Sequence, residues 1–440
     1  MRRLLGLRDF VHDAIDKTTD LVEQTHEAVA SKPMTVLSKV PPLASAARAV
    51  NDARRLTAKA VFDGIRATNR SVQSLSDMGL SLAGQVLGQP PATPDLASAA
   101  QLPAVRTVAD WADRAESALN AVAGDFLESR DNGLSIKMSI RREGRTLHLT
   151  QAELTVAVPH PTKKICVFVH GLGCSDSVWR KRDEVSDLEQ DFARRLEREH
   201  GYTTFHLRYN TGLHISQNGR SLAQLVTALL AVYPEDVTDI ALVGHSMGGL
   251  VCRSAAHYAQ ELGYDWVESL THVLCIGSPH FGAPLEKAGN VLAAVLEKIP
   301  VAGTQVPAKI LKARSVGIKD LAFGSVVDED WLDKDPDAFF TDTSKHTPFV
   351  DGVTYGYVAA RYRPGASSAL GELLGDLLVQ VPSASGKHRD PTRHLPFHMG
   401  HVLDGVHHVA MTRHPEVYKQ LERFLTECRI SNVRQLTLPH

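Results

Sequence analysis

The sequence predicts an α/β fold, in which helices cover both faces of a mostly parallel β-sheet. From about residue 133 onward, short apolar runs alternate with amphipathic helical segments. The apolar runs are continuous, as is typical of strands buried on both faces of a parallel sheet. Residues 1–130, by contrast, show helical periodicity and no strand pattern. We therefore expect a helical N-terminal segment over 1–130, followed by an α/β domain over 131–440.

The N-terminal segment contains stripes of small and apolar residues spaced three and four apart, as in amphipathic helices. The stripes cover 7–28, 53–67 and 105–126. Such stripes usually pack against other parts of a protein, so we interpret the segment as a bundle or arm on the α/β domain. The alternative is a peripheral contact with a lipid surface through residues 1–130. Because the stripes are not rich in Leu and Trp, strong membrane insertion is disfavoured.

The α/β domain is expected to open with a β-hairpin, in which 134–140 and 146–149 flank the turn Arg-Glu-Gly. Further strands are expected at 164–169, 203–209, 240–243, 272–276 and 354–360. Helices are expected at 187–199, 222–232, 250–262 and 415–425. Ser216 or Asn218 is expected to cap the second of these helices.

Residues 283–350 interrupt the alternation with a long, partly helical insertion between two strands. The insertion contains the apolar stretches 291–299 and 301–310. Long loops inside a compact domain are usually functional. We interpret this one as a cap over a site at the edge of the sheet, with a surface decoration as the alternative.

The composition is that of an ordinary globular protein. Of the 440 residues, 43% are hydrophobic and 22% are charged, and the net charge is −2. This charge argues against nucleic acid or a strongly acidic substrate as the partner. The length favours two domains, or one domain with large additions.

The five cysteines form no CxxC pair, and Cys166 and Cys275 stand inside apolar, strand-like runs. We interpret these two as buried reduced thiols of an intracellular protein. The apolar run after the N-terminal arginines is shorter than the roughly 7–15 residues of a signal-peptide core. No stretch approaches the roughly 18 apolar residues of a membrane span. We therefore expect a cytoplasmic protein without a transmembrane segment.

The strongest chemical signal is the motif Gly244-His245-Ser246-Met247-Gly248, which directly follows an apolar strand-like run. An apolar helical segment follows from about residue 250. A Gly-x-Ser-x-Gly motif between a strand and a helix is typical of a nucleophile elbow, a strained turn that exposes the serine hydroxyl above the sheet. The glycines are needed because side chains there would collide with the neighbouring strand and helix. The motif predicts that Ser246 is a catalytic nucleophile.

A second signal lies upstream, where an apolar strand runs into His170-Gly171-Leu172-Gly173. A loop at this place supplies the second donor of an oxyanion hole. The backbone N–H groups of Leu172 and Met247 are therefore expected to form that hole. The alternative is a Gly-rich turn without a catalytic role, which the order and spacing relative to Ser246 disfavour.

A serine nucleophile needs a base, and the C-terminal third of the chain is rich in histidine. The base is expected in the loop just before the final helix. His408 is the predicted base, and His407 is the runner-up. His394 and His398 are four residues apart, but a proline between them disfavours the helix that would align them on a metal. No metal site is expected.

The acid is expected after the strand at 354–360, because serine, acid and histidine follow one another in this order. The candidates are Glu372, Asp376 and Asp390. Asp376 stands between a glycine and an apolar run, where a carboxylate can orient an imidazole. Asp404 is too close to His408 in sequence and is expected to lie in a turn.

Residues from about 134 to 440 resemble bacterial α/β-hydrolases of the lipase and esterase type, including the branch related to the PGAP-like inositol deacylases. The matching motifs are HGLG at 170–173, GHSMGGL at 244–250, IGSPHFGAPLEKAGN at 276–290, GDLLVQVPSASG at 375–386 and HHVAMTRHPEVYKQL at 407–421. The resemblance implies that Asp376 is the acid, that His408 is the histidine, and that the reaction passes through an acyl-enzyme. Such lipases often have Gly-Asp-Gly at the acid, whereas Leu377 replaces the second glycine here. The resemblance does not cover residues 1–130.

Together these features predict a serine hydrolase that cleaves lipid-like or acyl esters with a triad of Ser246, His408 and Asp376. The expected partner is a small-molecule ester or lipid, with no nucleic acid and no cofactor. One alternative is acyl transfer to an alcohol on the same triad, which product partition would reveal. The other is a non-catalytic scaffold that binds a lipid surface or a partner through its N-terminal helices. Deletion of residues 1–130 would test it.

Overall fold

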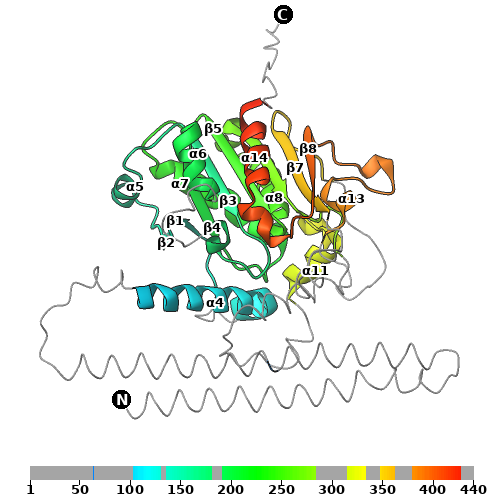
Figure 1. Ribbon diagram of the computed structural model, residues 1–440, viewed down its shortest axis with the longest axis horizontal. Coiled ribbons are helices and arrows are strands. Elements are labelled where there is room, and N and C mark those ends of the chain that lie inside the picture. The colour runs from blue at the N-terminus through cyan, green and yellow to red at the C-terminus, as the bar shows by residue number, and fades with distance from the viewer. Residues whose placement is uncertain are drawn as a thin grey trace, which may run out of the picture. The chain divides into compact units, whose positions relative to one another are not determined.

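The computed structural model (Figure 1) describes residue 63 and the ranges 103–129, 135–180, 191–283, 315–332, 347–361 and 379–427. The chain folds into two compact units, of which one comprises 1–134 and 291–315 and the other comprises 135–290 and 316–440. The helical stripes expected at 7–28 and 53–67 fall almost entirely outside the described residues. So does most of the proposed cap, and the role of that insertion stays a prediction.

In the first unit, helix α4 (Pro103–Ser129) is 27 residues long. It confirms the helix expected over 105–126. The hydroxyl of Ser315 donates to the carbonyl oxygen of Ala121 at 2.6 Å, so α4 is joined to a segment far away in the sequence. None of the helices in the described ranges is long and apolar enough to cross a membrane.

The second unit is built on an eight-stranded sheet with the order β2-β1-β4-β3-β5-β6-β7-β8. The strands are β1 (Ser139–Arg142), β2 (Arg145–Thr146), β3 (Lys164–Val169), β4 (Thr203–Arg208), β5 (Asp239–His245), β6 (Leu270–Ile276), β7 (Thr354–Arg361) and β8 (Met399–Asp404). Strand β1 pairs antiparallel with β2 and β4, and every other neighbouring pair is parallel. This mostly parallel sheet confirms the predicted fold class, including the hairpin at its start.

Strand β8 has no counterpart among the expected elements. It lies at the edge of the sheet and is mostly half-buried or exposed, so it lacks the continuous apolar run that marks the inner strands. The turn expected at Asp404 is wrong. Asp404 ends β8, opposite Arg361 of β7, with 3.7 Å between its carboxylate and the guanidinium.

The helices of this unit are α5 (Gln151–Ala157), α6 (Phe192–His200), α7 (Ile215–Val232), α8 (Met247–Glu261), α11 (Val316–Phe323), α13 (Val381–Ala384) and α14 (Pro415–Glu427). Four of them match the expected helices. Helix α6 begins later than expected because the carboxylate of Asp191 accepts from the N–H of Arg194 and caps it there.

Helix α7 begins before both expected caps, so that expectation was wrong. Ser216 and Asn218 lie inside the helix and are buried. The first N–H of the helix, on Ile215, donates at 2.8 Å to the carboxylate of Asp320 on α11. A carboxylate from another part of the chain therefore satisfies the exposed donors of this helix terminus.

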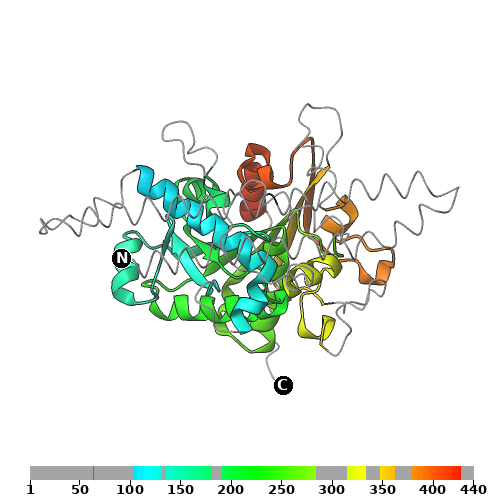
Figure 2. The ribbon, with the colours of Figure 1, turned by 90° about the horizontal axis from the view of Figure 1, so that it is seen from below.

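Helices cover both faces of the sheet. Helices α6 and α14 pack against one face, where Phe168, Val243 and Ile276 are fully buried. Helices α7 and α8 pack against each other on the other face, and α8 contacts β3, β5 and β6. Figure 2 shows α14, in red, on the side of the sheet opposite to α8. Cys166, Cys252 and Cys275 are buried free thiols, which confirms that Cys166 and Cys275 are buried and unpaired.

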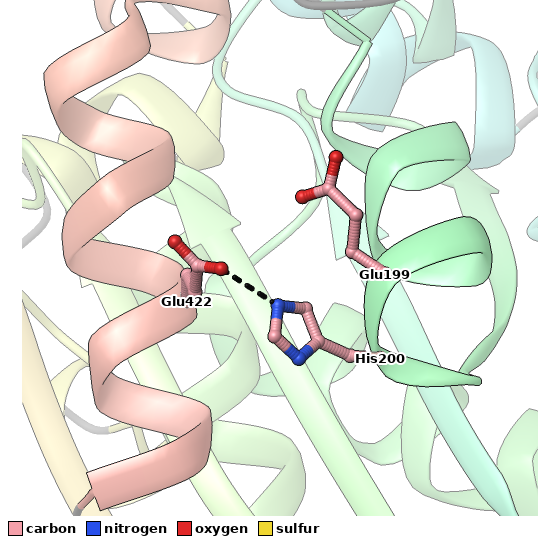
Figure 3. A group of neighbouring side chains, drawn as sticks. All are labelled: Glu199, His200 and Glu422. Atoms are coloured by element: carbon pink, nitrogen blue, oxygen red, sulfur yellow. Dashed lines mark hydrogen bonds and ion pairs between the residues drawn. The ribbon is translucent and has the colours of Figure 1, made fainter.

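Polar side chains at the C-terminal end of α6 also contact α14 (Figure 3). Glu422 of α14 lies 2.9 Å from the Nε2 atom of His200. Next to this pair, the hydroxyl of Tyr418 donates to Glu199 at 2.9 Å, and the guanidinium of Arg195 stacks on the Tyr418 ring at 3.6 Å. Two helices that are distant in sequence are therefore held together on this face of the sheet.

The carboxylate of Glu199 is stabilised as an anion. Burial opposes its ionisation, but hydrogen bonds from Arg198, Arg195 and Tyr418 outweigh burial and lower the pKa of Glu199 to about 2. Its ligand atom lies within 4.8 Å of those of His200 and Glu422, a spacing that a metal ion could also use. Two guanidinium groups of α6 itself already neutralise Glu199, so we interpret the cluster as a hydrogen-bonded link between α6 and α14.

Candidate active site

The candidate site lies at the carboxyl edge of the sheet, where the strand order reverses. The chain leaves β3 toward β4 on one side, and it leaves the adjacent β5 toward β6 on the other. Ligands of open α/β sheets bind in the crevice at such a switch point. The two predicted motifs follow β3 and β5 directly, so both lie at this crevice.

Ser246 forms the sharp corner between β5 and α8. Its φ and ψ angles are 55° and −122°, and among the described residues other than glycine only Glu143 also has a positive φ. Such backbone strain is of order 1–3 kcal/mol and is typical of functional sites. The turn is held because the N–H of Ser246 donates to Ile276 at 2.8 Å and its carbonyl accepts from Gly249 at 3.1 Å. The serine itself is half-buried.

The glycines around Ser246 are required by space. A side chain on Gly244 would overlap the backbone of Gly248, and one on Gly248 would overlap the carbonyl oxygen of Val169. A Cβ on Gly171 would lie 3.0 Å from the Cβ of Ser246. The loop after β3 therefore lies directly against Ser246.

The two predicted oxyanion donors, Leu172 and Met247, belong to these facing loops. Leu172 lies inside a tight turn closed by the N–H of Cys174, which donates to Gly171 at 3.2 Å. Met247 is the first residue of α8. Within the described part of the chain, the N–H of neither residue donates to another protein group. Met247 lies at the N-terminus of α8, where the helix favours negative charge.

His170 stabilises the loop that carries Leu172. Its ring stacks on Tyr209 at 4.5 Å between centroids, and the Tyr209 hydroxyl donates to its carbonyl at 2.7 Å. Its Nδ1 lies 3.0 Å from the carbonyl oxygen of Gly171, so Nδ1 carries the proton. Burial lowers the pKa of His170 to about 4, so the ring is neutral at neutral pH.

His408 lies beside the elbow. It follows β8 and precedes the short helix η6 (Val409–Arg413). A Cβ added to Gly277 would lie 3.0 Å from Cε1 and 3.1 Å from Nδ1 of its ring. Gly277 comes directly after Ile276, the residue that binds the N–H of Ser246. Burial, and then the neighbouring His245, lower the pKa of His408, which keeps the ring in the neutral form that a base requires.

Asp376 and Glu372 lie in 362–378, outside the described residues. Among the described residues, no carboxylate contributes to the environment of His408. Asp390 is exposed, and it accepts from the N–H of Thr392 at 3.0 Å, which caps the short helix η5 (Pro391–Arg393). Its role is therefore local.

Two contacts at this edge carry no signal in the sequence. The Nε2 atom of His245 lies 3.0 Å from the carbonyl oxygen of His408. Arg253, two turns along α8 from the serine, is buried and donates to Nδ1 of His280 at 3.1 Å, with Thr347 on its other side. His280 lies just before the long insertion at 283–350 and Thr347 lies near its end, so Arg253 contacts both of its stems. No local motif could have predicted either contact.

The strand order and the strained serine between β5 and α8 define an α/β-hydrolase fold. Residues 160–354 match the model of one family, the PGAP1-like alpha/beta domain. This match confirms the resemblance to the PGAP-like branch of the lipase and esterase type. No curated protein matches the chain.

Several solved structures are similar to the chain at low identity. The mature form of lipase BlEst2 from Bacillus licheniformis is 21% identical to this chain, with a TM-score of 0.37. The match includes 62% of this chain and 95% of the lipase chain. A lipase-esterase related protein from Clostridium acetobutylicum is 15% identical, with 60% and 95% covered and a TM-score of 0.35. A thermophilic esterase from Thermogutta terrifontis is also 15% identical, with 61% and 92% covered and a TM-score of 0.35.

Proposed function

We propose that the protein is a serine hydrolase that cleaves carboxylic esters. The observation that carries this proposal is the elbow at Ser246, a strained, half-buried serine at the start of α8, with His408 packed against the end of the next strand. The Ser246 hydroxyl makes no capping hydrogen bond to α8, so helix capping does not account for a serine at this position.

In the proposed reaction, His408 takes the proton of the Ser246 hydroxyl while the oxygen attacks the ester carbonyl. The N–H groups of Leu172 and Met247 stabilise the negative charge on the tetrahedral intermediate. The intermediate collapses to an acyl-serine as His408 gives its proton to the departing alcohol. Water, deprotonated by the same histidine, then releases the carboxylic acid and restores the serine.

The acid partner of His408 is proposed to be Asp376. It belongs to the segment that leaves β7, and β7 lies between β6 and β8 in the sheet. The carboxyl ends of parallel strands lie at one edge of the sheet. The segment after β7 therefore starts between the end of β6, which leads to Gly277, and the end of β8, which leads to His408.

The proposed substrates are lipid-like or medium-chain acyl esters. The support comes from the sequence of the insertion at 283–350, whose apolar stretches 291–299 and 301–310 suit an apolar acyl chain. Its two stems start and end close to the site, because His280 and Thr347 both contact Arg253 of α8.

Hydrolysis of a series of p-nitrophenyl acyl esters by the full-length protein tests the proposal. The wild type is expected to turn over, with a preference for acyl chains longer than acetyl. Ser246→Ala is expected to be inactive while keeping the wild-type melting temperature. A fluorophosphonate is expected to label the wild type at Ser246. A wild type with neither turnover nor labelling, or an active Ser246→Ala variant, would contradict the assignment.

A further inference from the structure

His245, the residue before the proposed nucleophile, makes a contact that the reaction scheme does not use. It ends β5 and is 1% exposed. Its Nε2 atom lies 3.0 Å from the carbonyl oxygen of His408, a residue 163 positions away in the chain. The two imidazole rings are 4.7 Å apart between centroids. One strand end therefore carries the nucleophile and also contacts the backbone of the proposed base.

We infer that His245 is a positioning residue, whose Nε2–H holds the backbone of His408 in the place from which its ring can serve Ser246. This inference rests on the proposed function, because it assigns His245 a task in the same site.

The direction of the hydrogen bond follows from its partners. A carbonyl oxygen only accepts, so Nε2 of His245 carries the proton and Nδ1 does not. Nδ1 is buried and has no hydrogen-bond partner among the described residues. Burial lowers the pKa of His245 to about 4 and the bond to His408 opposes this only in part, so the ring is neutral and in a single tautomer at neutral pH.

The surroundings of the ring keep it from turning away. The edge of Trp179 meets it at 87° with 6.3 Å between centroids. On the other side, a Cβ on Gly171 would lie only 3.3 Å from its Nδ1. A rigid ring on a central strand is suited to hold a loop, because positioning groups act best when their own rotamers are locked.

The segment that carries His408 has a second tether, which supplies a control. The hydroxyl of Thr412 lies 3.0 Å from the carbonyl oxygen of Val178 and 2.9 Å from that of Val409, and its one hydrogen serves both acceptors. These contacts fix the end of η6 rather than His408 itself. Loss of the Thr412 bond is therefore expected to lower stability without the same loss of turnover.

Three variants of the full-length protein separate positioning from space filling. In His245→Gln the side-chain amide nitrogen can reach the position of Nε2 and still donate to the carbonyl oxygen of His408. In His245→Asn the side chain is too short to reach that position. His245→Phe fills the volume without any donor. The glutamine variant is expected to keep most of kcat. The other two are expected to lose kcat about tenfold to a hundredfold with little change in KM, as expected for a misplaced catalytic group.

If His245 has only a structural role, the order of kcat among the three variants is expected to be reversed. His245→Phe would then be the best variant, because it removes a buried nitrogen without a partner, and activity would follow the melting temperature. A phenylalanine variant with the wild-type kcat, or a folded glutamine variant as impaired as the asparagine variant, overturns the inference. Thr412→Val is the matched control, with a lower melting temperature and a kcat close to wild type expected.

A measurement on the wild type does not depend on activity. The ¹⁵N NMR spectrum of histidine-labelled protein, with His245 assigned through its backbone neighbours, reports which ring nitrogen carries the proton. A protonated Nε2 that persists from pH 8 to pH 5 is the expected result, and a protonated Nδ1 overturns the inference. A wild type without turnover or labelling at Ser246 would reject the proposed function, and the tautomer would still show whether the bond exists.

Discussion

At the scale of single residues, the carbonyl oxygen of Val169 occupies the place where a side chain on Gly248 would have to be. This overlap shows how closely β3 and the first turn of α8 approach each other beneath Ser246. The same approach brings the loop at Gly171 against the serine. The local sequence predicted the strand-to-helix corner at Ser246, because a motif of small residues between a strand and a helix has few structural solutions.

Gly248→Ala is expected to lower the free energy of unfolding by about 1–3 kcal/mol, because the added methyl group must push β3 and α8 apart. Ester hydrolysis is expected to fall by up to about a hundredfold, since Leu172 moves with the loop that follows β3. Denaturant unfolding and p-nitrophenyl ester kinetics measure the two effects.

Gly201→Ala is the control for this substitution. Gly201 has a φ of 66° and nothing within 4 Å of an added Cβ, so only the strain of the left-handed backbone is expected, about 1–2 kcal/mol. Its kcat is expected to match the wild type. Equal kinetics in both variants would show that the contact under Ser246 does not position the site.

At the scale of elements, the inner strands β3, β5, β6 and β7 were predictable, because burial on both faces demands continuous apolar runs. The edge strand β8 was not, since five of its six residues are half-buried or exposed. The start of α7 could not be predicted either, because its capping carboxylate on Asp320 lies 105 positions away. The link from His245 to His408 is hidden from the sequence for the same reason.

Asp320→Ala is expected to destabilise the protein by about 2 kcal/mol, because it removes the acceptor for the first N–H of α7 and the partner of His214. Asp328→Ala is the comparison within the same segment. Its ion pair with Arg220 is more exposed, and its loss is expected to amount to less than about 1 kcal/mol. Denaturant unfolding of both variants provides the test, and equal losses would contradict the capping role.

At the scale of the whole molecule, the second unit encloses several neutral histidines around its sheet. His170, His206, His245 and His280 are at most 4% exposed. Burial lowers the pKa of His170 and His245 to about 4 and that of His206 to about 3, and it also lowers the pKa of His280. In the unfolded chain these groups titrate near pH 6.5. The unfolded state therefore binds more protons over this interval.

The stability of the protein is expected to be constant above about pH 7 and to fall as the pH drops from about 6.5 toward 4. Each histidine that is protonated only on unfolding contributes up to about 1.4 kcal/mol per pH unit. His206 offers a sharp check, because neither of its ring nitrogens has a hydrogen-bond partner among the described residues. His206→Phe is expected to reduce the slope by about one proton. Denaturant unfolding from pH 8 to pH 4 measures how steeply the free energy of unfolding depends on pH. The same slope in His206→Phe and in the wild type would contradict the prediction that His206 is protonated only on unfolding.

The position of β8 has a consequence for biosynthesis. The chain contributes Ser246 near its middle, whereas His408 follows the last strand to be added at the sheet edge. Because synthesis proceeds from the N-terminus, the central strands can be released from the ribosome and begin to fold before His408, the proposed base, has been made. The proposed hydrolysis is therefore expected to begin only once the chain has been translated beyond His408.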